Sequence, residues 1–110
     1  MTEYTYVVPG RPIPQGRPRM TRRGRVYTPE TTYLHQNLIR DSYKGPLFTD
    51  SVEVLVDFDP EWTEITVRDY EYTSPLRGDI DNYLKAVLDG LQPVAFENDR
   101  QVMSVWMEKL

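Results

Sequence analysis

Residues 77–91 read RGDIDNYLKAVLDGL, and the organisation of the whole chain follows from this stretch. Its apolar residues recur at intervals of three and four positions, which predicts one buried face of an α-helix. These residues are Ile80, Leu84, Val87, Leu88 and Leu91. Short polar side chains favour the N-cap position, so Asp81 or Asn82 is expected to begin the helix. The helix is expected to end at Gly90 or Leu91, within a residue or two.

Acidic side chains gather around the start of this helix. Asp79 precedes Asp81 by two residues, Lys85 follows Asp81 by four, and Asp99 comes soon after the helix in the segment Glu97-Asn98-Asp99. Carboxylates that meet at one point repel one another unless a cation lies between them, and oxygen ligands suit Mg²⁺ or Mn²⁺. An ordinary explanation is equally open, because the helix dipole favours acids in a first turn and Asp81 with Lys85 can form a surface ion pair.

Length and composition exclude several classes of protein. A chain of 110 residues is expected to form a single domain, residues 1–110. The absence of cysteine excludes disulfides and thiolate chemistry, and the single histidine, His35, excludes a multi-histidine zinc site. His35 is expected on a helix surface. No apolar run approaches the ~18 residues that cross a bilayer, and the N-terminus lacks the features of a signal peptide, so a cytoplasmic protein is expected.

Charge is divided unevenly along the chain. Residues 1–45 carry eight Lys or Arg against three Asp or Glu, whereas residues 46–110 carry five against fourteen. Residues 10–25, GRPIPQGRPRMTRRGR, hold six arginines and no acid, and their prolines and glycines predict a loop. Arginine binds phosphate through a planar fork, which favours a nucleic-acid backbone over a merely solvated loop. The six are Arg11, Arg17, Arg19, Arg22, Arg23 and Arg25.

The remaining patterns predict further elements. Strands are expected at residues 4–8, 51–59, 65–72 and 101–109, with a short one at 26–28. The polar content of 65–72 indicates an edge strand. A helix is expected from the Thr28-Pro29-Glu30 start, with Thr28 as cap, to about Tyr43. Its weak apolar stripe comprises Tyr33, Leu34, Leu38 and Ile39. This order predicts a small α/β (α+β) fold, in which two helices pack on a mixed sheet.

The central stretch resembles the RusA family of crossover junction endodeoxyribonucleases, which phages and prophages often encode. The family pattern is Asp-x-Asp-Asn-x-x-Lys, then Val-x-Asp-x-Leu, then an acidic pair before Gln-Val and a strand that ends in lysine. Here these motifs stand at residues 79–85, 87–91 and 98–102. The opening Pro-Gln-Gly-Arg-Pro-Arg and Arg-Val-Tyr-Thr-Pro segments are also similar. In a departure from the pattern, the acidic pair is Asn98-Asp99.

The resemblance implies a fold, an activity and a set of site residues. Asp79, Asp81 and Asp99 are expected to bind the catalytic metal, Mg²⁺ or Mn²⁺, and Lys85 is expected to be catalytic. Asp89, one turn beyond Lys85, is expected to be structural. The arginines of residues 10–25, together with Arg77, are expected to bind DNA. The family acts as a homodimer on four-way (Holliday) junctions in DNA recombination and repair.

Two alternatives remain open at this stage. The chain can be a DNA-binding module with a degenerate site, because Asn98 and the short C-terminus depart from the family pattern. It can also be a metal-dependent nuclease of another branched or single-stranded DNA.

The segment containing Met103, Val105, Trp106 and Met107 is apolar on both faces, which places it in a central strand or at a dimer interface.

Overall fold

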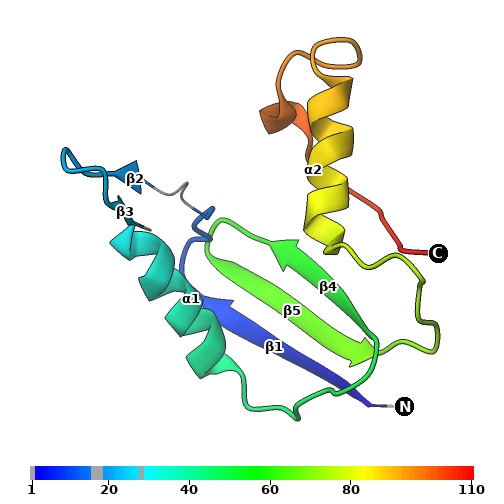
Figure 1. Cartoon of the computed structure of the whole chain (residues 1–110). Helices are drawn as coiled ribbons and strands as arrows, with labels where there is room; N and C mark the ends of the chain where they lie inside the picture. The colour runs from blue at the N-terminus through cyan, green and yellow to red at the C-terminus, as the bar shows by residue number, and fades with distance from the viewer. Residues whose placement is uncertain (1, 16–18, 28) are drawn as a thin grey trace. The chain divides into compact units, whose positions relative to one another are not determined.

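The computed structural model describes residues 2–15, 19–27 and 29–110, and two compact units can be distinguished in it, Met1–Glu71 and Tyr72–Leu110. The first unit holds a sheet, a small hairpin and helix α1, and the second holds helix α2 and a 3₁₀ turn (Figure 1). The predicted α+β class is confirmed. None of the helices in the described residues is long and apolar enough to cross a bilayer.

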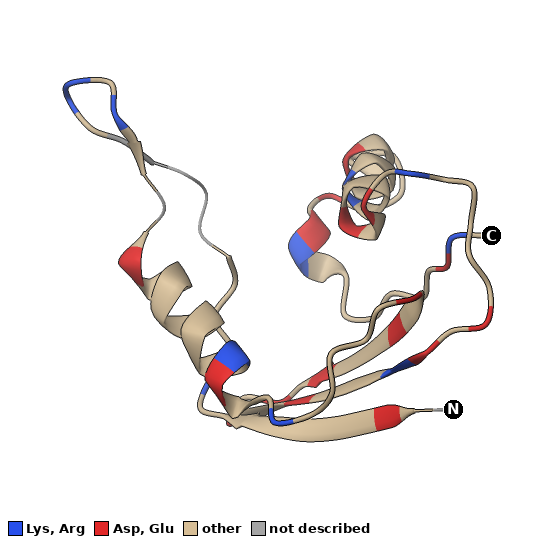
Figure 2. Cartoon of the chain, turned by 60° about the horizontal axis from the view of Figure 1, so that its bottom comes forward, with Lys and Arg blue, Asp and Glu red and all other residues tan. Residues whose placement is uncertain are grey.

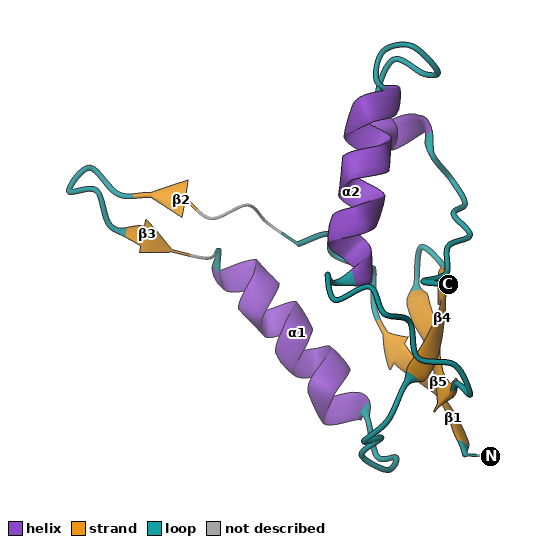
Figure 3. Cartoon of the chain, turned by 45° about the vertical axis from the view of Figure 1, so that its right-hand side comes forward, coloured by secondary structure: helices purple, strands orange, loops and turns teal. Residues whose placement is uncertain are grey.

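The sheet of the first unit has three antiparallel strands in the order β1 (Glu3–Pro9), β5 (Trp62–Asp69), β4 (Val52–Phe58). The predicted strands at 4–8 and 51–59 are therefore confirmed, but the expectation that 65–72 forms an edge is wrong. Figure 3 shows these strands in orange. All strand pairings in this sheet are antiparallel, in contrast to the mixed sheet that was expected.

Two polar residues of β5 are bonded to its neighbouring strands. Arg68 lies opposite Glu3 on β1 and opposite Glu53 on β4, and its guanidinium is 2.5 Å from Glu53 Oε1 and 3.5 Å from Glu3 Oε1. The hydrogen bond with Glu53, followed by the charge of that carboxylate, raises the pKa of Arg68. Thr66 likewise bonds Thr5 across the sheet at 2.8 Å. Cross-strand pairs of this kind allow a polar strand to occupy the centre.

Helix α1 (Glu30–Ser42) packs on β1, with Pro29 at its N-cap. The predicted cap, Thr28, lies outside the described residues. The predicted stripe is wrong except for Ile39, because Tyr33, Leu34 and Leu38 are exposed. The side that is covered instead comprises Thr32, His35, Gln36 and Ile39. His35 is thus half-buried rather than on the surface, and its Nε2 accepts a hydrogen bond from Ile13 N at 3.5 Å.

Three tyrosines join β1 to the end of α1. The ring of Tyr4 lies 5.9 Å from that of Tyr6 and 5.0 Å from that of Tyr43, the latter in an edge-to-face arrangement. Burial, and then the charges of Tyr43 and Tyr4, raise the pKa of Tyr6. Gly45 lies against the ring of Tyr4, where an added Cβ would come within 2.5 Å of the ring. Aromatic packing therefore fixes the turn that follows α1.

Residues 10–27, expected to be a loop with one short strand, contain a hairpin of two two-residue strands. β2 (Arg19–Met20) pairs with β3 (Val26–Tyr27), which confirms the described part of the strand predicted at 26–28. The turn between them closes through Thr21 N bonded to Arg25 O at 2.8 Å. Gly24 in that turn has φ +80°, a conformation that favours glycine. Glycine thus shapes the hairpin turn, and the prolines and glycines of this segment do not prevent β2 and β3 from pairing.

The second unit consists of α2 (Ile80–Leu91), the 3₁₀ turn η1 (Asp99–Gln101) and an extended tail. The N-cap of α2 is Asp79, so the helix begins before the predicted Asp81 or Asn82, and Gly90 lies inside it. Its apolar face is only partly covered, with Leu84 and Leu88 half-buried and Val87 57% exposed. The strand predicted at 101–109 is wrong, because the fully described tail 102–110 forms no strand.

Candidate active site

One face of α2 and the turn η1 border an open hollow of about 260 Å³. Positions 81, 84, 85 and 88 follow the i, i+3, i+4, i+7 spacing of a single helix face. Asp99 reaches the same hollow from η1. The lining residues are Asp81, Leu84, Lys85, Leu88, Asp89 and Asp99. The structure thus brings together three of the four residues expected to be catalytic, Asp81, Lys85 and Asp99.

The fourth of these residues, Asp79, is not among those that line the hollow. It occupies the N-cap of α2, with φ −68° and ψ 141°, and its side chain makes no capping hydrogen bond. Its main-chain oxygen accepts instead from Asn82 N at 3.1 Å and from Tyr83 N at 3.4 Å. Asp79 therefore begins the helix through its backbone, so its carboxylate is not used to cap the helix.

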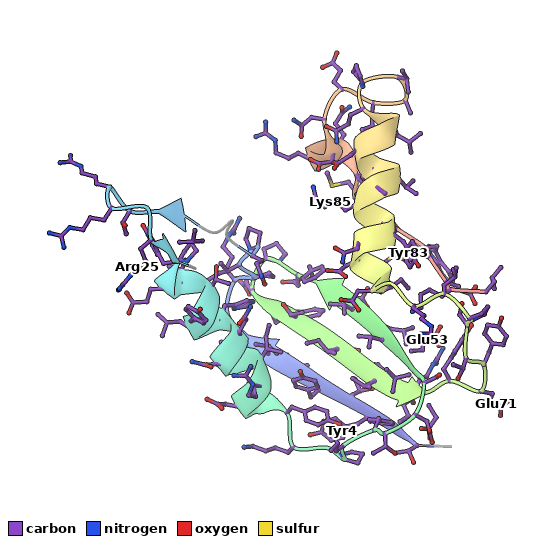
Figure 4. The ribbon with its side chains drawn as sticks, viewed as in Figure 1. Tyr4, Arg25, Glu53, Glu71, Tyr83 and Lys85 are labelled. Atoms are coloured by element: carbon purple, nitrogen blue, oxygen red, sulfur yellow. The ribbon has the colours of Figure 1, made fainter. Side chains whose placement is uncertain are left out.

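Lys85 is paired along the helix with Asp89. Lys85 Nζ lies 3.1 Å from Asp89 Oδ2, and the two side chains are 68% and 56% exposed. The described residues contain no Asp81–Lys85 ion pair, but Asp81 lies in the first turn of α2, where the helix dipole favours an acid. The contact agrees with the expected structural role of Asp89. An exposed pair of this kind stabilises the helix only slightly, so its main effect is to restrict where the ammonium lies. Figure 4 labels Lys85 on α2.

Asn98 has a structural function that the family pattern did not predict. Its side-chain oxygen accepts from Arg100 N at 2.9 Å, and Gln101 Oε1 accepts in return from Asn98 N at 3.0 Å. This reciprocal capping box begins η1 and so places Asp99. The Asn-x-x-Gln spacing at residues 98–101 is a sequence signature of such a box and could have revealed it. Asn98, which stands where the family pattern has an acid, thus serves as the N-cap of η1.

The donor chemistry of the hollow fits a hard divalent cation. Asp81 and Asp99 both present carboxylate oxygens there, the ligand type that Mg²⁺ and Mn²⁺ prefer. Within the described ranges, no three acidic or histidine side chains approach closely enough to form a complete metal site. Of the three carboxylates that line the hollow, Asp89 is paired with Lys85, which leaves Asp81 and Asp99 as candidate ligands there, with Asp79 at the adjacent end of α2.

The arginines expected to bind DNA are distributed over both units. Arg22, Arg23 and Arg25 are exposed at the hairpin turn, where Figure 2 shows basic residues in blue. Arg11 is exposed after β1, and Arg77 is exposed before α2. Arg17 lies outside the described residues, as does the side chain of Arg19. The segment after Arg11 is tied to α1, because Gln36 Nε2 donates to Gln15 Oε1 at 3.0 Å.

Comparison with known families identifies the chain. Residues 9–110 match the family model described as endodeoxyribonuclease RusA. The chain belongs to the RusA family. This match covers most of the first unit and all of the second, and it confirms the resemblance carried by the motifs at residues 79–85, 87–91 and 98–102. The RusA family is one of endodeoxyribonucleases, so the broad class of activity follows from membership. Neither the curated proteins nor the solved structures gave a match to this chain.

Proposed function

We propose that this protein is a Mg²⁺-dependent endodeoxyribonuclease that resolves four-way DNA junctions by phosphodiester hydrolysis. The observation that carries the proposal is the RusA family match over residues 9–110, which includes every residue of the hollow. Residues 1–110 are proposed to act as a single RusA-like domain. Junction resolution places the activity in DNA recombination or repair, in a bacterial or phage-infected cytoplasm.

The proposed metal ligands are Asp79, Asp81 and Asp99. Two of them line the hollow, and their oxygen donors suit Mg²⁺, with Mn²⁺ as a substitute. A carboxylate-bound Mg²⁺ would supply an activated water and stabilise negative charge on the phosphate. The negative charge of the three carboxylates repels phosphate oxygens wherever no positive charge compensates it, which restricts how the DNA backbone can approach.

Lys85 is proposed to act directly on the scissile phosphate. Its ammonium belongs to a side chain that lines the hollow together with Asp99, and Asp89 holds it along the helix at 3.1 Å. A positive charge at this position stabilises the charge that develops on the phosphate oxygens or on the leaving oxygen in the transition state. Because both side chains of the pair are exposed, the substrate can displace Asp89 from Lys85 at little cost.

DNA binding and symmetry complete the proposal. The arginines of residues 10–25 and Arg77 are proposed to contact the phosphate backbone that flanks the cleavage point. A symmetric junction requires two cuts, and the described residues of one chain present one hollow lined by the proposed ligands Asp81 and Asp99. We therefore propose a homodimer with two-fold symmetry, which presents two identical sites to two strands.

The deciding experiment incubates the protein with a labelled four-way junction and Mg²⁺, beside a linear duplex and a single strand of the same sequence. Paired, symmetric nicks confined to the junction are expected. Binding without cutting at any Mg²⁺ or Mn²⁺ concentration would support a DNA-binding module with a degenerate site. Preferential cutting of flap or single-stranded DNA would assign a different substrate to the same site.

A further inference from the structure

The residue before Asp79 is held at both of its backbone polar groups. Lys109 Nζ donates a part-buried hydrogen bond to Gly78 O at 3.0 Å. Gly78 N donates in turn to the hydroxyl of Tyr83 at 3.2 Å. Lys109 comes from the tail, 31 positions further along the chain, whereas Tyr83 lies in the first turns of α2. All three residues belong to the second unit.

The fit around Gly78 leaves no room for a side chain. A Cβ at this position would lie 2.8 Å from Cε2, Cζ and the hydroxyl oxygen of Tyr83. The main chain can approach the ring so closely only because residue 78 is glycine. Figure 4 labels Tyr83 near the start of α2. The positions of the two peptide groups that flank Gly78 are therefore set by the Tyr83 side chain on one side and by the Lys109 ammonium on the other.

A second contact fastens the tail to the same loop. Ser74 Oγ donates to the main-chain oxygen of Leu110 at 2.9 Å and accepts from Leu76 N at 3.0 Å. Figures 1 and 3 show the tail running back along α2 to the end where the helix begins. Lys109 is half-buried there, although most of its neighbours in the tail are exposed. The tail thus places the ammonium of Lys109 against the main-chain carbonyl of Gly78.

We propose that Lys109 is a positioning residue for Asp79. Its ammonium holds the Gly78–Asp79 peptide and the Tyr83 hydroxyl holds the Arg77–Gly78 peptide. Together they set the direction in which the chain enters α2, which decides where the Asp79 carboxylate lies. The inference rests on the proposed function, in which Asp79 is a metal ligand. A hydrogen bond from an ammonium is stronger than one between neutral groups. Outer groups that orient metal ligands typically contribute 10–100-fold to metal affinity or activity.

The test compares Lys109→Met, Lys109→Arg and Tyr83→Phe with the control Lys44→Met. Met keeps the length of the side chain and removes its charge and donor, whereas Arg keeps both. Lys44 is exposed in the first unit, so its variant matches the change in net charge. Four quantities are measured: junction cleavage, the Mg²⁺ concentration for half-maximal cleavage, junction affinity in EDTA, and the amide NMR signals of Gly78 and Asp79.

For Lys109→Met we expect cleavage to fall by about 10–100-fold and the Mg²⁺ requirement to rise, with junction affinity in EDTA unchanged. The Asp79 amide should shift, because it shares a peptide with the carbonyl that loses its partner. Tyr83→Phe should shift the Gly78 amide and lower cleavage while keeping the ring. Lys109→Arg should restore most of the cleavage, and Lys44→Met should leave every quantity unchanged.

Wild-type cleavage and Mg²⁺ dependence in Lys109→Met would overturn the proposal, as would an unchanged Asp79 amide. A parallel loss of thermal stability and junction affinity, without rescue by arginine, would assign Lys109 a purely structural role. Failure of the wild-type protein to cut the junction would overturn the proposed function instead. The Asp79 amide and its response to added Mg²⁺ would then still decide whether Lys109 positions Asp79.

Discussion

At the scale of single residues, Asp81 and Asp99 come from different segments and meet at one hollow. Asp81→Asn is nearly isosteric and removes one of the three carboxylates that line it. Amide oxygen is a poorer ligand for a hard cation, so Mg²⁺-dependent junction cleavage should fall by at least ~100-fold. Junction affinity in EDTA should hold or rise, because a negative charge near phosphate is lost. Gel-based cleavage and binding assays measure both effects.

Asp41→Asn is the matched control for Asp81→Asn, since Asp41 is also helical and exposed but lies on α1. The loss of a first-turn acid from α2 should cost at most about 1 kcal/mol in free energy of unfolding. Near-normal cleavage by folded Asp81→Asn protein would remove Asp81 from the proposed metal site.

Two glycines should respond to alanine in opposite directions. A Cβ on Gly45 would enter the ring of Tyr4, so Gly45→Ala should lower the free energy of unfolding by about 1–3 kcal/mol. Gly90 lies inside α2 with open space around it, so Gly90→Ala should raise the free energy of unfolding by about 0.5–1 kcal/mol. Thermal and urea unfolding measure both. Equal effects of the two substitutions would contradict the packing of Tyr4 against Gly45.

At the scale of elements, the β2–β3 hairpin presents Arg22, Arg23 and Arg25 together. Replacing all three with alanine should weaken junction binding. The dependence of log affinity on log salt should become flatter by up to about 0.9 for each phosphate that is no longer neutralised. Arg40→Ala is the control, because Arg40 is basic but lies on α1, away from the hairpin in the sequence. An unchanged salt slope in the hairpin variant would exclude phosphate binding by this hairpin.

Sequence patterns correctly predicted the helices and strands that depend only on residues close together in the sequence. The alternation at residues 51–59 and the Gly-Pro stop after α1 lie within a few residues, and both strand and helix were found. The central position of β5 depends on Glu3 and Glu53, which lie far from Arg68 in the sequence, so its polar composition was misleading. Residues 101–109 carry a strand pattern, but a strand also requires a neighbour to pair with, and the pattern cannot supply one.

The candidate site was predictable to a similar degree. Helical spacing alone places Asp81 and Lys85 on one face, whereas the approach of Asp99 depends on the capping box of Asn98 and Gln101. The link from Lys109 to Gly78 spans 31 positions and follows from no local motif. Residue spacing therefore identified Asp81 and Lys85 on one helix. The residues that support the site, Asn98, Gln101 and Lys109, were identified only from the fold.

At the scale of the whole molecule, we expect a homodimer in solution. Sedimentation at micromolar concentration should give about twice the 12.9 kDa mass of the chain. Met103→Ser with Trp106→Ser should weaken the dimer if the exposed tail contributes to the interface, since these residues are 84% and 95% exposed. Leu47→Ser, which also changes a highly exposed apolar residue, is the control. A monomer that resolves junctions symmetrically at full rate would contradict this expectation.

Because Trp106 is highly exposed, its fluorescence can also report the binding of a partner to the tail. The chain has two tryptophans, and Trp62, on β5, is 36% exposed. In a Trp62→Phe background the fluorescence comes from the indole of Trp106 alone. Any partner that covers the tail should move that emission to shorter wavelengths and protect it from iodide quenching. The arrival of a second subunit or of a DNA junction can then be followed in real time without attaching a dye.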